Sequence, residues 1–130
     1  FWNKLAILDH SSTSVGLVQA FPQKEMVSTT FEQHAKTTET LVPADGEVIL
    51  VIAEPDKSDT KKIDLDTVKA FRLQAGDAVT LHRNTWHFAP VVKEKPVKTW
   101  VIFEEDTPDN DLFMRHVDEE NEVRFLVVGA

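Results

Sequence analysis

The sequence predicts an all-β protein, built as a sandwich or a small barrel. Short apolar runs of strand length recur along the chain, and turn signals rich in Gly, Pro, Asp and Asn separate them at roughly regular spacing. No internal repeat of fixed period and no low-complexity segment interrupts this pattern. Together these observations indicate one sheet-based core.

The first half of the chain contains three predicted strands. Residues 14–21 (SVGLVQAF) form an apolar run, and residues 27–34 (VSTTFEQH) contain an alternating segment. Residues 47–53 (EVILVIA) are rich in β-branched side chains and follow the turn signal of residues 44–46. A loop is expected at residues 55–59.

The second half continues the same alternation of turns and strands. Residues 64–71 (DLDTVKAF) predict either a short helix or the approach to a strand. Gly76 and Asp77 predict a turn before the strand of residues 78–82. Further strands are expected at residues 99–103 (TWVIF) and 123–128 (VRFLVV).

Length and composition limit the class of protein. The 130 residues predict one domain, and 42% hydrophobic with 28% charged residues is typical of a soluble globular protein. The chain has no cysteine, so disulfide and thiolate chemistry are excluded and any metal site must use His, Asp or Glu. Without an apolar run of about 20 residues or a signal-peptide pattern, we expect a cytoplasmic protein without a membrane span.

The charge argues against polyanionic partners. A net charge of −8 disfavours both nucleic acid and an anionic membrane. Nine acidic residues lie in the C-terminal part, residues 101–130, against only two arginines. Because burying unpaired acids costs free energy, we expect residues 104–111 and 118–122 to be mostly exposed connections around the last strand.

Two groups of polar residues could form one site. The first has the spacing Glu32-x-His34-x4-Glu39-x6-Gly46, and on a strand Glu32 and His34 would face the same side. The second has the spacing Gly76-x5-His82-x4-His87. The ionisable residues of the two groups are therefore candidates for one shared site: Glu32, His34, Glu39, His82 and His87.

Each residue also has a structural interpretation. His34 could be a strand histidine with one structural hydrogen bond, and Trp86 could belong to the core. Arg83 could be solvated or could pair with an acid such as Asp77.

The paired motifs resemble those of the cupin superfamily, which implies a double-stranded β-helix, also called a jelly roll. The resemblance places the cupin metal ligands on Glu32, His34, Glu39 and His87, and implies a divalent Ni, Mn or Zn ion or a metal-free variant. Glu32 stands where cupins usually have a histidine, and His82 replaces the proline of the second motif. The resemblance implies that the five ionisable residues of the two groups face one cavity inside a small barrel.

Four strings sharpen the resemblance within residues 18–90. FEQH, PADGEVILVIA, DLDTVKAF and LHRNTWHFAP occur in an order similar to that of the ureidoglycolate lyase family, and HRNTWH is the most specific of them. The family resemblance implies a lyase that cleaves ureidoglycolate, a small carboxylate, to glyoxylate and urea in allantoin breakdown. Phe88 fills a place where the family usually has a second histidine.

The resemblance also suggests roles for individual residues. His82 would be a proton shuttle, with His87 and Glu39 as further catalytic groups. Arg83, Lys69 and Trp86 would contact the substrate. By analogy with other cupins we expect a homodimer. Two alternatives stay open: a related metal-dependent cupin enzyme acting on another small hydroxy- or keto-acid, and a non-catalytic cupin that binds a small carboxylate.

Overall fold

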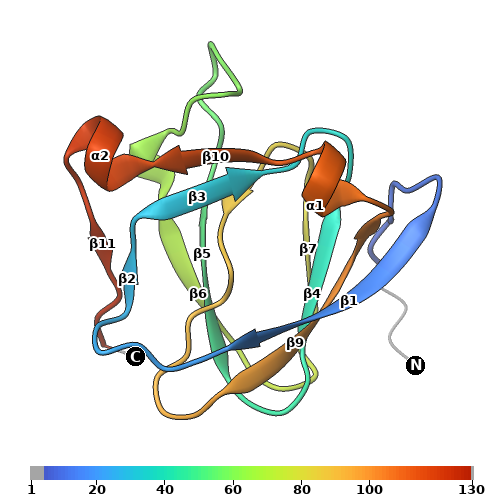
Figure 1. Ribbon diagram of the computed structural model, residues 1–130, viewed down its shortest axis with the longest axis horizontal. Coiled ribbons are helices and arrows are strands. Elements are labelled where there is room, and N and C mark those ends of the chain that lie inside the picture. Colours follow the sequence, from blue (N-terminus) through green and yellow to red (C-terminus); the bar gives the residue numbers. More distant parts are fainter. Residues whose placement is uncertain (1–4, 130) are drawn as a thin grey trace.

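Two antiparallel sheets and a short third pair of strands make up the protein (Figure 1). The computed structural model describes residues 5–129. The first sheet consists, in spatial order, of β1 (Thr13–Ala20), β9 (Val97–Glu104), β4 (Glu39–Pro43) and β7 (Val79–Leu81). The second consists of β10 (Phe113–His116), β3 (Thr30–Gln33), β8 (Trp86–His87), β5 (Val48–Ala53) and β6 (Lys69–Leu73). The remaining pair is β2 (Val27–Ser28) with β11 (Phe125–Leu126).

Neighbouring strands in each sheet are mostly distant in the sequence. β9 lies between β1 and β4, and β8 lies between β3 and β5. The chain therefore crosses repeatedly from one sheet to the other, and a strand from one half of the sequence pairs with strands from the other half. This topology brings together β3, β4 and β8, which contain Glu32, Glu39 and His87, and His34 directly follows β3.

The core lies partly between the two sheets and partly on the outer face of the second sheet. One buried cluster joins Leu41 and Val101 of the first sheet to Leu50 of the second. Another covers the opposite face of the second sheet, where Trp86 and Phe31, both 0% exposed, pack with Val117 of the C-terminal part. Alternate residues of β5 join the two clusters, with Leu50 in one and Val51 in the other, so the second sheet is buried on both faces around this strand.

Gly46 of the first motif has a packing role. A β-carbon built at this position would lie 2.7 Å from Cγ2 of Val97, a side chain that is 1% exposed. Because that valine is fixed in the core beside Val48, any larger residue would displace β9. The motif glycine thus permits the turn before β5 to pack closely against β9.

Most predicted elements are present with shifted ends. The runs at residues 14–21, 47–53 and 99–103 correspond to β1, β5 and β9. The run at 27–34 is divided into β2 and β3, and residues 64–71 contain a 3-10 helix, Leu65–Thr67, followed by the start of β6. The run at 78–82 gives β7, and only Phe125–Leu126 of residues 123–128 is a strand. The sequence pattern missed β4, β8 and β10.

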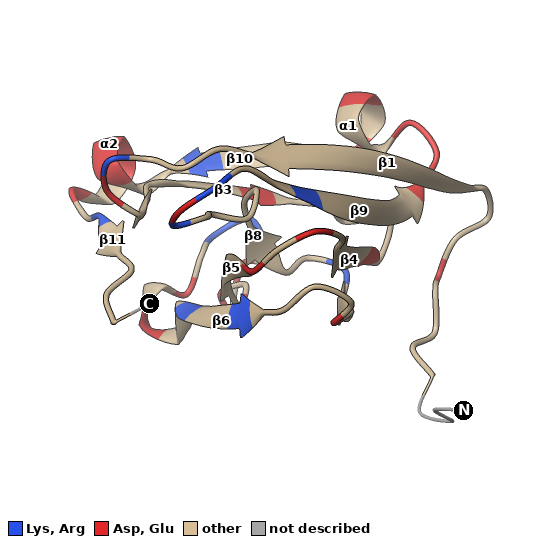
Figure 2. Ribbon diagram, turned by 90° about the horizontal axis from the view of Figure 1, so that it is seen from below, with Lys and Arg blue, Asp and Glu red and all other residues tan. Residues whose placement is uncertain are grey.

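The acidic C-terminal part is mostly exposed, as predicted, but it is more structured than a set of connections. It contains β10 and two short helices, α1 (Thr107–Asn110) and α2 (Val117–Asn121), whose acidic residues are visible in Figure 2. One acid departs from the prediction, because Asp111 is only 5% exposed. None of the helices within residues 5–129 is long and apolar enough to cross a membrane.

Glu104, at the end of β9, fastens the segment that precedes β1. Its carboxylate accepts hydrogen bonds from the backbone N–H and hydroxyl of Ser11 and from the backbone N–H of Ser12, all at 2.8 Å. These bonds favour the ionised form and therefore lower the pKa of Glu104 below its usual range.

Glu104→Gln should destabilise the protein in a pH-dependent way. Because the folded-state pKa is lowered, the ionised carboxylate stabilises the fold above the unfolded-state value, and this stabilisation disappears as the pH falls through the folded-state pKa. Thermal melts should therefore show a lower Tm for the variant at pH 7, and the difference from wild type should shrink towards pH 3. A gap that stays constant over this range would contradict the assignment.

Candidate functional site

Three strands bring four of the predicted residues together. Glu32 lies on β3 directly opposite His87 of β8 in the antiparallel register. His34 follows the end of β3, and Glu39 begins β4 after a short turn. His34, Glu39 and His87 are buried, whereas the side chain of Glu32 is 24% exposed.

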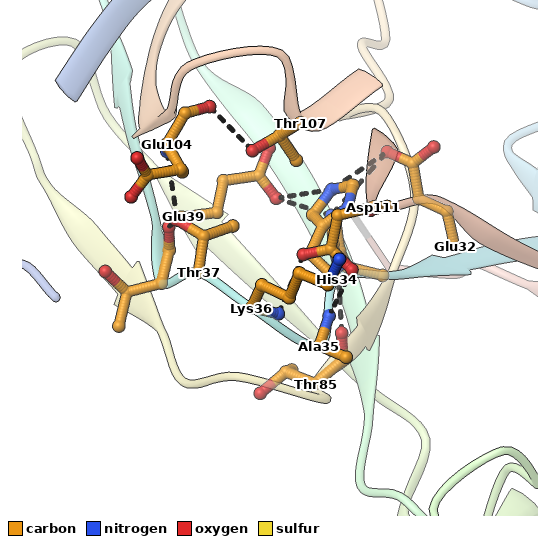
Figure 3. Close-up of polar contacts among 12 residues, drawn as sticks. Glu32, His34, Ala35, Lys36, Thr37, Glu39, Thr85, Glu104, Thr107 and Asp111 are labelled. Carbon is orange, nitrogen blue, oxygen red and sulfur yellow. Dashed lines mark hydrogen bonds and ion pairs between the residues drawn. The ribbon is translucent and has the colours of Figure 1, made fainter. Parts of the chain in front are cut away.

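The four side chains converge on one point, and Figure 3 shows Glu32, His34 and Glu39 among them. Nε2 of His87 lies 2.5 Å from Oε2 of Glu39 and 3.6 Å from Oε1 of Glu32. Nε2 of His34 lies 3.7 Å from the same Glu39 oxygen and 4.0 Å from the same Glu32 oxygen. The residues of the two motifs therefore lie together. Glu32 and His34 point to the same side, as the sequence predicted.

Two backbone carbonyls set the direction of the imidazole rings. Nδ1 of His34 donates to the carbonyl of Asp111 at 2.7 Å, and Nδ1 of His87 donates to the carbonyl of Thr85 at 3.0 Å. A carbonyl oxygen can only accept, so each Nδ1 must bear a proton. In the neutral rings, both Nε2 lone pairs then face the cluster.

Buried polar atoms without hydrogen bonds are concentrated here. Among residues 5–129, four buried side-chain polar atoms have no hydrogen-bond partner, and three of them are Nε2 of His34, Nε2 of His87 and Oε2 of Glu39. With the His87 proton on Nδ1, the 2.5 Å approach sets two lone pairs against each other, which requires a positive charge between or beside them. That charge is either a proton on His87 or a cation held by the cluster.

The donor set fits a divalent cation. Glu32, His34 and His87 each offer one ligand atom, and these atoms lie within 4.8 Å of one another. Imidazole nitrogen and carboxylate oxygen are common ligands of Zn, Ni and Mn. Oε2 of Glu39 lies close enough to both histidines to join the same group.

The pKa values of the two glutamates are shifted in opposite directions. Burial raises the pKa of Glu32 above its usual value, although the nearby histidines oppose this effect. Burial alone would raise the pKa of Glu39 as well. The charge of His87 and its close contact with the Glu39 carboxylate outweigh burial, so the pKa of Glu39 is lowered. The pKa of His87 is raised, because Glu39 overcomes the opposing effect of burial.

A cavity of about 510 Å³ opens beside the cluster. Glu32, His34 and Glu39 line it, and its walls include aliphatic and aromatic residues of β1 and β9, such as Val101 and Phe103. The segment 106–112 contributes four more lining residues, two of them acids, at Asp106, Pro108, Asp109 and Leu112. Among the described residues that line the cavity, none is Lys or Arg.

The prediction that His82 shares this cavity is wrong. Its side chain is exposed and lines a separate depression with Asp9 and Arg83. The cause is the turn after β7, in which Asn84 has a φ of 68° and the Thr85 N–H bonds to the His82 carbonyl. This turn lets the chain enter β8 in a new direction, so two histidines five residues apart diverge.

The three predicted substrate contacts also lie away from the cavity. Arg83 is 2.5 Å from Asp9, with which it forms an ion pair, and it does not contact the predicted partner Asp77. Lys69 is exposed on β6, the edge strand of the second sheet. Trp86 is fully buried in the core, and its Nε1–H donates to the carbonyl of Lys62 at 3.2 Å. The structural interpretation of Trp86 is therefore the correct one.

Asp111 and Thr85 are site residues that the sequence did not reveal. Both act through backbone carbonyls, which every residue has, so no side-chain pattern identifies them. Asp111 was also one acid among nine in the C-terminal part.

Comparison with solved structures identifies the fold class. The oxalate oxidase solved in complex with glycolate superposes with a TM-score of 0.57 and 19% identity, over 82% of this chain and 46% of that one. Oxalate decarboxylase gives a TM-score of 0.55 and 16% identity, over 84% of this chain and 25% of that one. Both are cupins, which confirms the predicted cupin fold.

A family model narrows the class further. The ureidoglycolate lyase family matches residues 3–124, well beyond the segment 18–90 on which the sequence resemblance depended. The chain belongs to the ureidoglycolate lyase family.

Curated relatives have the same family name. The ureidoglycolate lyases of Salmonella paratyphi B and Salmonella typhimurium are each 29% identical to this chain over 108 residues, which is 82% of this chain and 65% of each relative. That of Salmonella enteritidis PT4 is 28% identical over the same length. The chain thus spans slightly less than two thirds of the length of these relatives.

The geometry predicts that replacing the two histidines of the HRNTWH string has very different effects on metal affinity. His87→Ala removes an atom at the centre of the cluster and should weaken Zn²⁺, Ni²⁺ or Mn²⁺ binding by about 10- to 100-fold or more. His82→Ala alters only the exposed depression and should change that affinity by about twofold at most. Isothermal titration calorimetry on both variants, after checking their melting curves, measures the difference. Equal losses in the two variants would refute the placement of His82.

Proposed function

We propose that this protein is a lyase that cleaves ureidoglycolate to glyoxylate and urea. The observation that supports this most directly is the convergence of Nε2 of His34, Nε2 of His87 and Oε2 of Glu39, buried and without hydrogen bonds, beside a cavity of about 510 Å³. Membership of the ureidoglycolate lyase family supplies the substrate class. The curated lyases are longer than the region that matches this chain. Their activity is therefore assigned to this protein as a proposal.

We further propose that Glu32, His34 and His87, with Glu39 beside them, hold one divalent cation, Ni, Mn or Zn. The three ligand atoms within 4.8 Å and the fixed Nδ1–H tautomers support this assignment. Among the structural relatives, the oxalate decarboxylase of Bacillus subtilis has Mn(II) centres. When bound, such a cation would neutralise the carboxylate of the substrate and polarise its oxygen atoms.

The charges of the cavity support a cation as the anchor of the substrate. Ureidoglycolate carries a carboxylate, whereas the ionisable residues lining the described cavity are His34 and the acids Glu32, Glu39, Asp106 and Asp109. Arg83 and Lys69, the basic residues first considered for this contact, lie elsewhere. An anion would be repelled by these acids unless a positive charge within the cluster outweighed them.

Glu39 is the residue best placed to transfer the proton of the substrate hydroxyl, because it lines the cavity and His82 does not. The substrate carbon has a hydroxyl group and a urea nitrogen. Glu39 would accept the hydroxyl proton as the C=O bond forms and the C–N bond breaks, and would then return that proton to the departing nitrogen. The atoms balance, because one ureidoglycolate gives one glyoxylate and one urea. Glu39 lines the cavity, and the lowering of its pKa by His87 keeps the carboxylate ionised and able to accept a proton, which supports this role.

The apolar wall supports the same chemistry. Val101 and Phe103 line the cavity, and the ring of Phe103 packs edge-on against His34 at 5.9 Å between centroids. Such a wall limits water around the reacting groups and strengthens the electrostatic interactions among them.

We also propose, by family analogy, that the protein is a single cupin domain and forms a cytoplasmic homodimer. It would act in allantoin and purine nitrogen breakdown.

An assay of both products tests the proposal. The purified protein with Zn²⁺, Ni²⁺ or Mn²⁺ should release glyoxylate and urea in equal amounts from ureidoglycolate. Glu39→Gln should reduce the rate by about 100-fold or more, as expected for loss of a general base. Glu119→Gln, an exposed acid of α2, is the matched control and should keep the wild-type rate.

Other results would direct the assignment elsewhere. Full activity in chelator would refute the metal, and His34 and His87 would then be substrate-binding groups of a metal-free lyase. Metal binding without urea release would refute the lyase. Turnover of another hydroxy- or keto-acid, or carboxylate binding without turnover, would then identify which of the two alternative functions applies.

A further inference from the structure

We infer that Asp111 is a positioning residue, whose carboxylate and carbonyl together fix His34 in the orientation that the site requires. This inference rests on the proposed metal-binding function of the cluster. Asp111 touches neither the cavity nor the convergence point and acts through the turn between β3 and β4.

Asp111 makes three contacts with consecutive residues of that turn (Figure 3). Its carbonyl accepts the Nδ1–H of His34 at 2.7 Å. Its Oδ1 accepts the backbone N–H of Ala35 at 2.9 Å, and its Oδ2 accepts that of Lys36 at 2.7 Å. The side chain of Asp111 is thus bound to the backbone that follows His34, while its main chain holds the His34 ring.

The arrangement has a direct consequence for the tautomer of His34. The carbonyl at position 111 exists whatever side chain is present, but its distance from the imidazole depends on where the backbone lies. The carboxylate fixes that distance by accepting two N–H groups, each bond being charge-assisted. If residue 111 moves away, Nδ1 loses its acceptor and the proton can move to Nε2, which removes the lone pair from the cluster.

A second contact holds the other end of the same turn. The backbone N–H of Glu104 donates to Oγ1 of Thr37 at 3.0 Å, and Thr37 is 1% exposed. Within residues 104–111, the hydroxyl of Thr107 donates to the carbonyl of Glu104 at 2.6 Å, and the N–H of Asp111 donates to the carbonyl of Thr107 at 3.0 Å. Residues 104–111 therefore brace the turn that joins His34 to Glu39 at both ends.

The same segment also forms part of the cavity rim. Asp106, Pro108 and Asp109 line the cavity, while Asp111, two residues on, holds His34 from behind. A displacement of this rim would therefore change the orientation of His34 as well as the shape of the opening. This link explains why one acid of an otherwise exposed acidic part is buried.

Three variants test the inference. Asp111→Ala removes both side-chain acceptors, Asp111→Asn keeps one of them, and Asp118→Ala removes an exposed acid of α2 as the control. For each, Zn²⁺, Ni²⁺ and Mn²⁺ affinity is measured by calorimetry, thermal stability by melting, and the His34 tautomer by the ¹⁵N chemical shifts of its ring. The NMR readout needs no metal.

The expected order of effects is specific. Asp111→Ala should lower metal affinity by about 10- to 100-fold, the usual effect of removing a group that orients a ligand, and should convert His34 to a mixture of tautomers. Asp111→Asn should lie between this variant and wild type, and Asp118→Ala should match wild type. If Asp111→Ala does not fold, Asp111→Asn gives the decisive comparison.

Two outcomes separate failure of this inference from failure of the proposed function. Unchanged metal affinity and an unchanged His34 tautomer in folded Asp111 variants would overturn the positioning role, whatever their melting temperatures. If wild type binds none of the three metals, the proposed metal site fails. A tautomer shift in the Asp111 variants would still support the positioning role, and its absence would overturn it.

Discussion

Everything in the site depends on the meeting of two imidazole nitrogens and a carboxylate oxygen in a buried place, without hydrogen bonds among them. With His87 neutral, such an arrangement is unfavourable by itself, because the buried acceptors that face one another are neither solvated nor paired. The protein keeps it by fixing each histidine from the opposite side, through the carbonyls of Asp111 and Thr85. A cation at the convergence point would turn this unfavourable arrangement into ligation.

The cupin topology supplies the rigidity that this arrangement needs. Register pairing of β3 with β8 places Glu32 opposite His87, and the turn into β4 adds His34 and Glu39. The packing of Phe31 and Trp86 beneath these strands leaves the backbone little freedom to relieve the crowding. Fold and site are therefore coupled, because inner strands of the two sheets carry or adjoin the four converging residues.

The cupin resemblance predicted that Glu39 and His87 join Glu32 and His34. The sequence pattern itself predicted the all-β fold and the shared face of Glu32 and His34, because period-two patterning reports side-chain direction along a strand. It failed where direction depends on a turn. Asn84, with its positive φ, directs His82 away from His87, and no residue spacing encodes that angle. Likewise the second part of the site, Asp111, lies 77 residues from His34 and is joined to it by a backbone carbonyl, which leaves no trace in composition or periodicity.

The central claim is that the cluster binds one divalent cation through His34 and His87. Anomalous diffraction at the zinc edge, from crystals grown with Zn²⁺, tests this directly. The account predicts one strong peak at about 2.0–2.1 Å from Nε2 of both His34 and His87, with a carboxylate oxygen of Glu32 or Glu39 completing the site. A cluster without a peak in zinc-saturated crystals, with a proton shared between His87 and Glu39 in its place, would contradict the account.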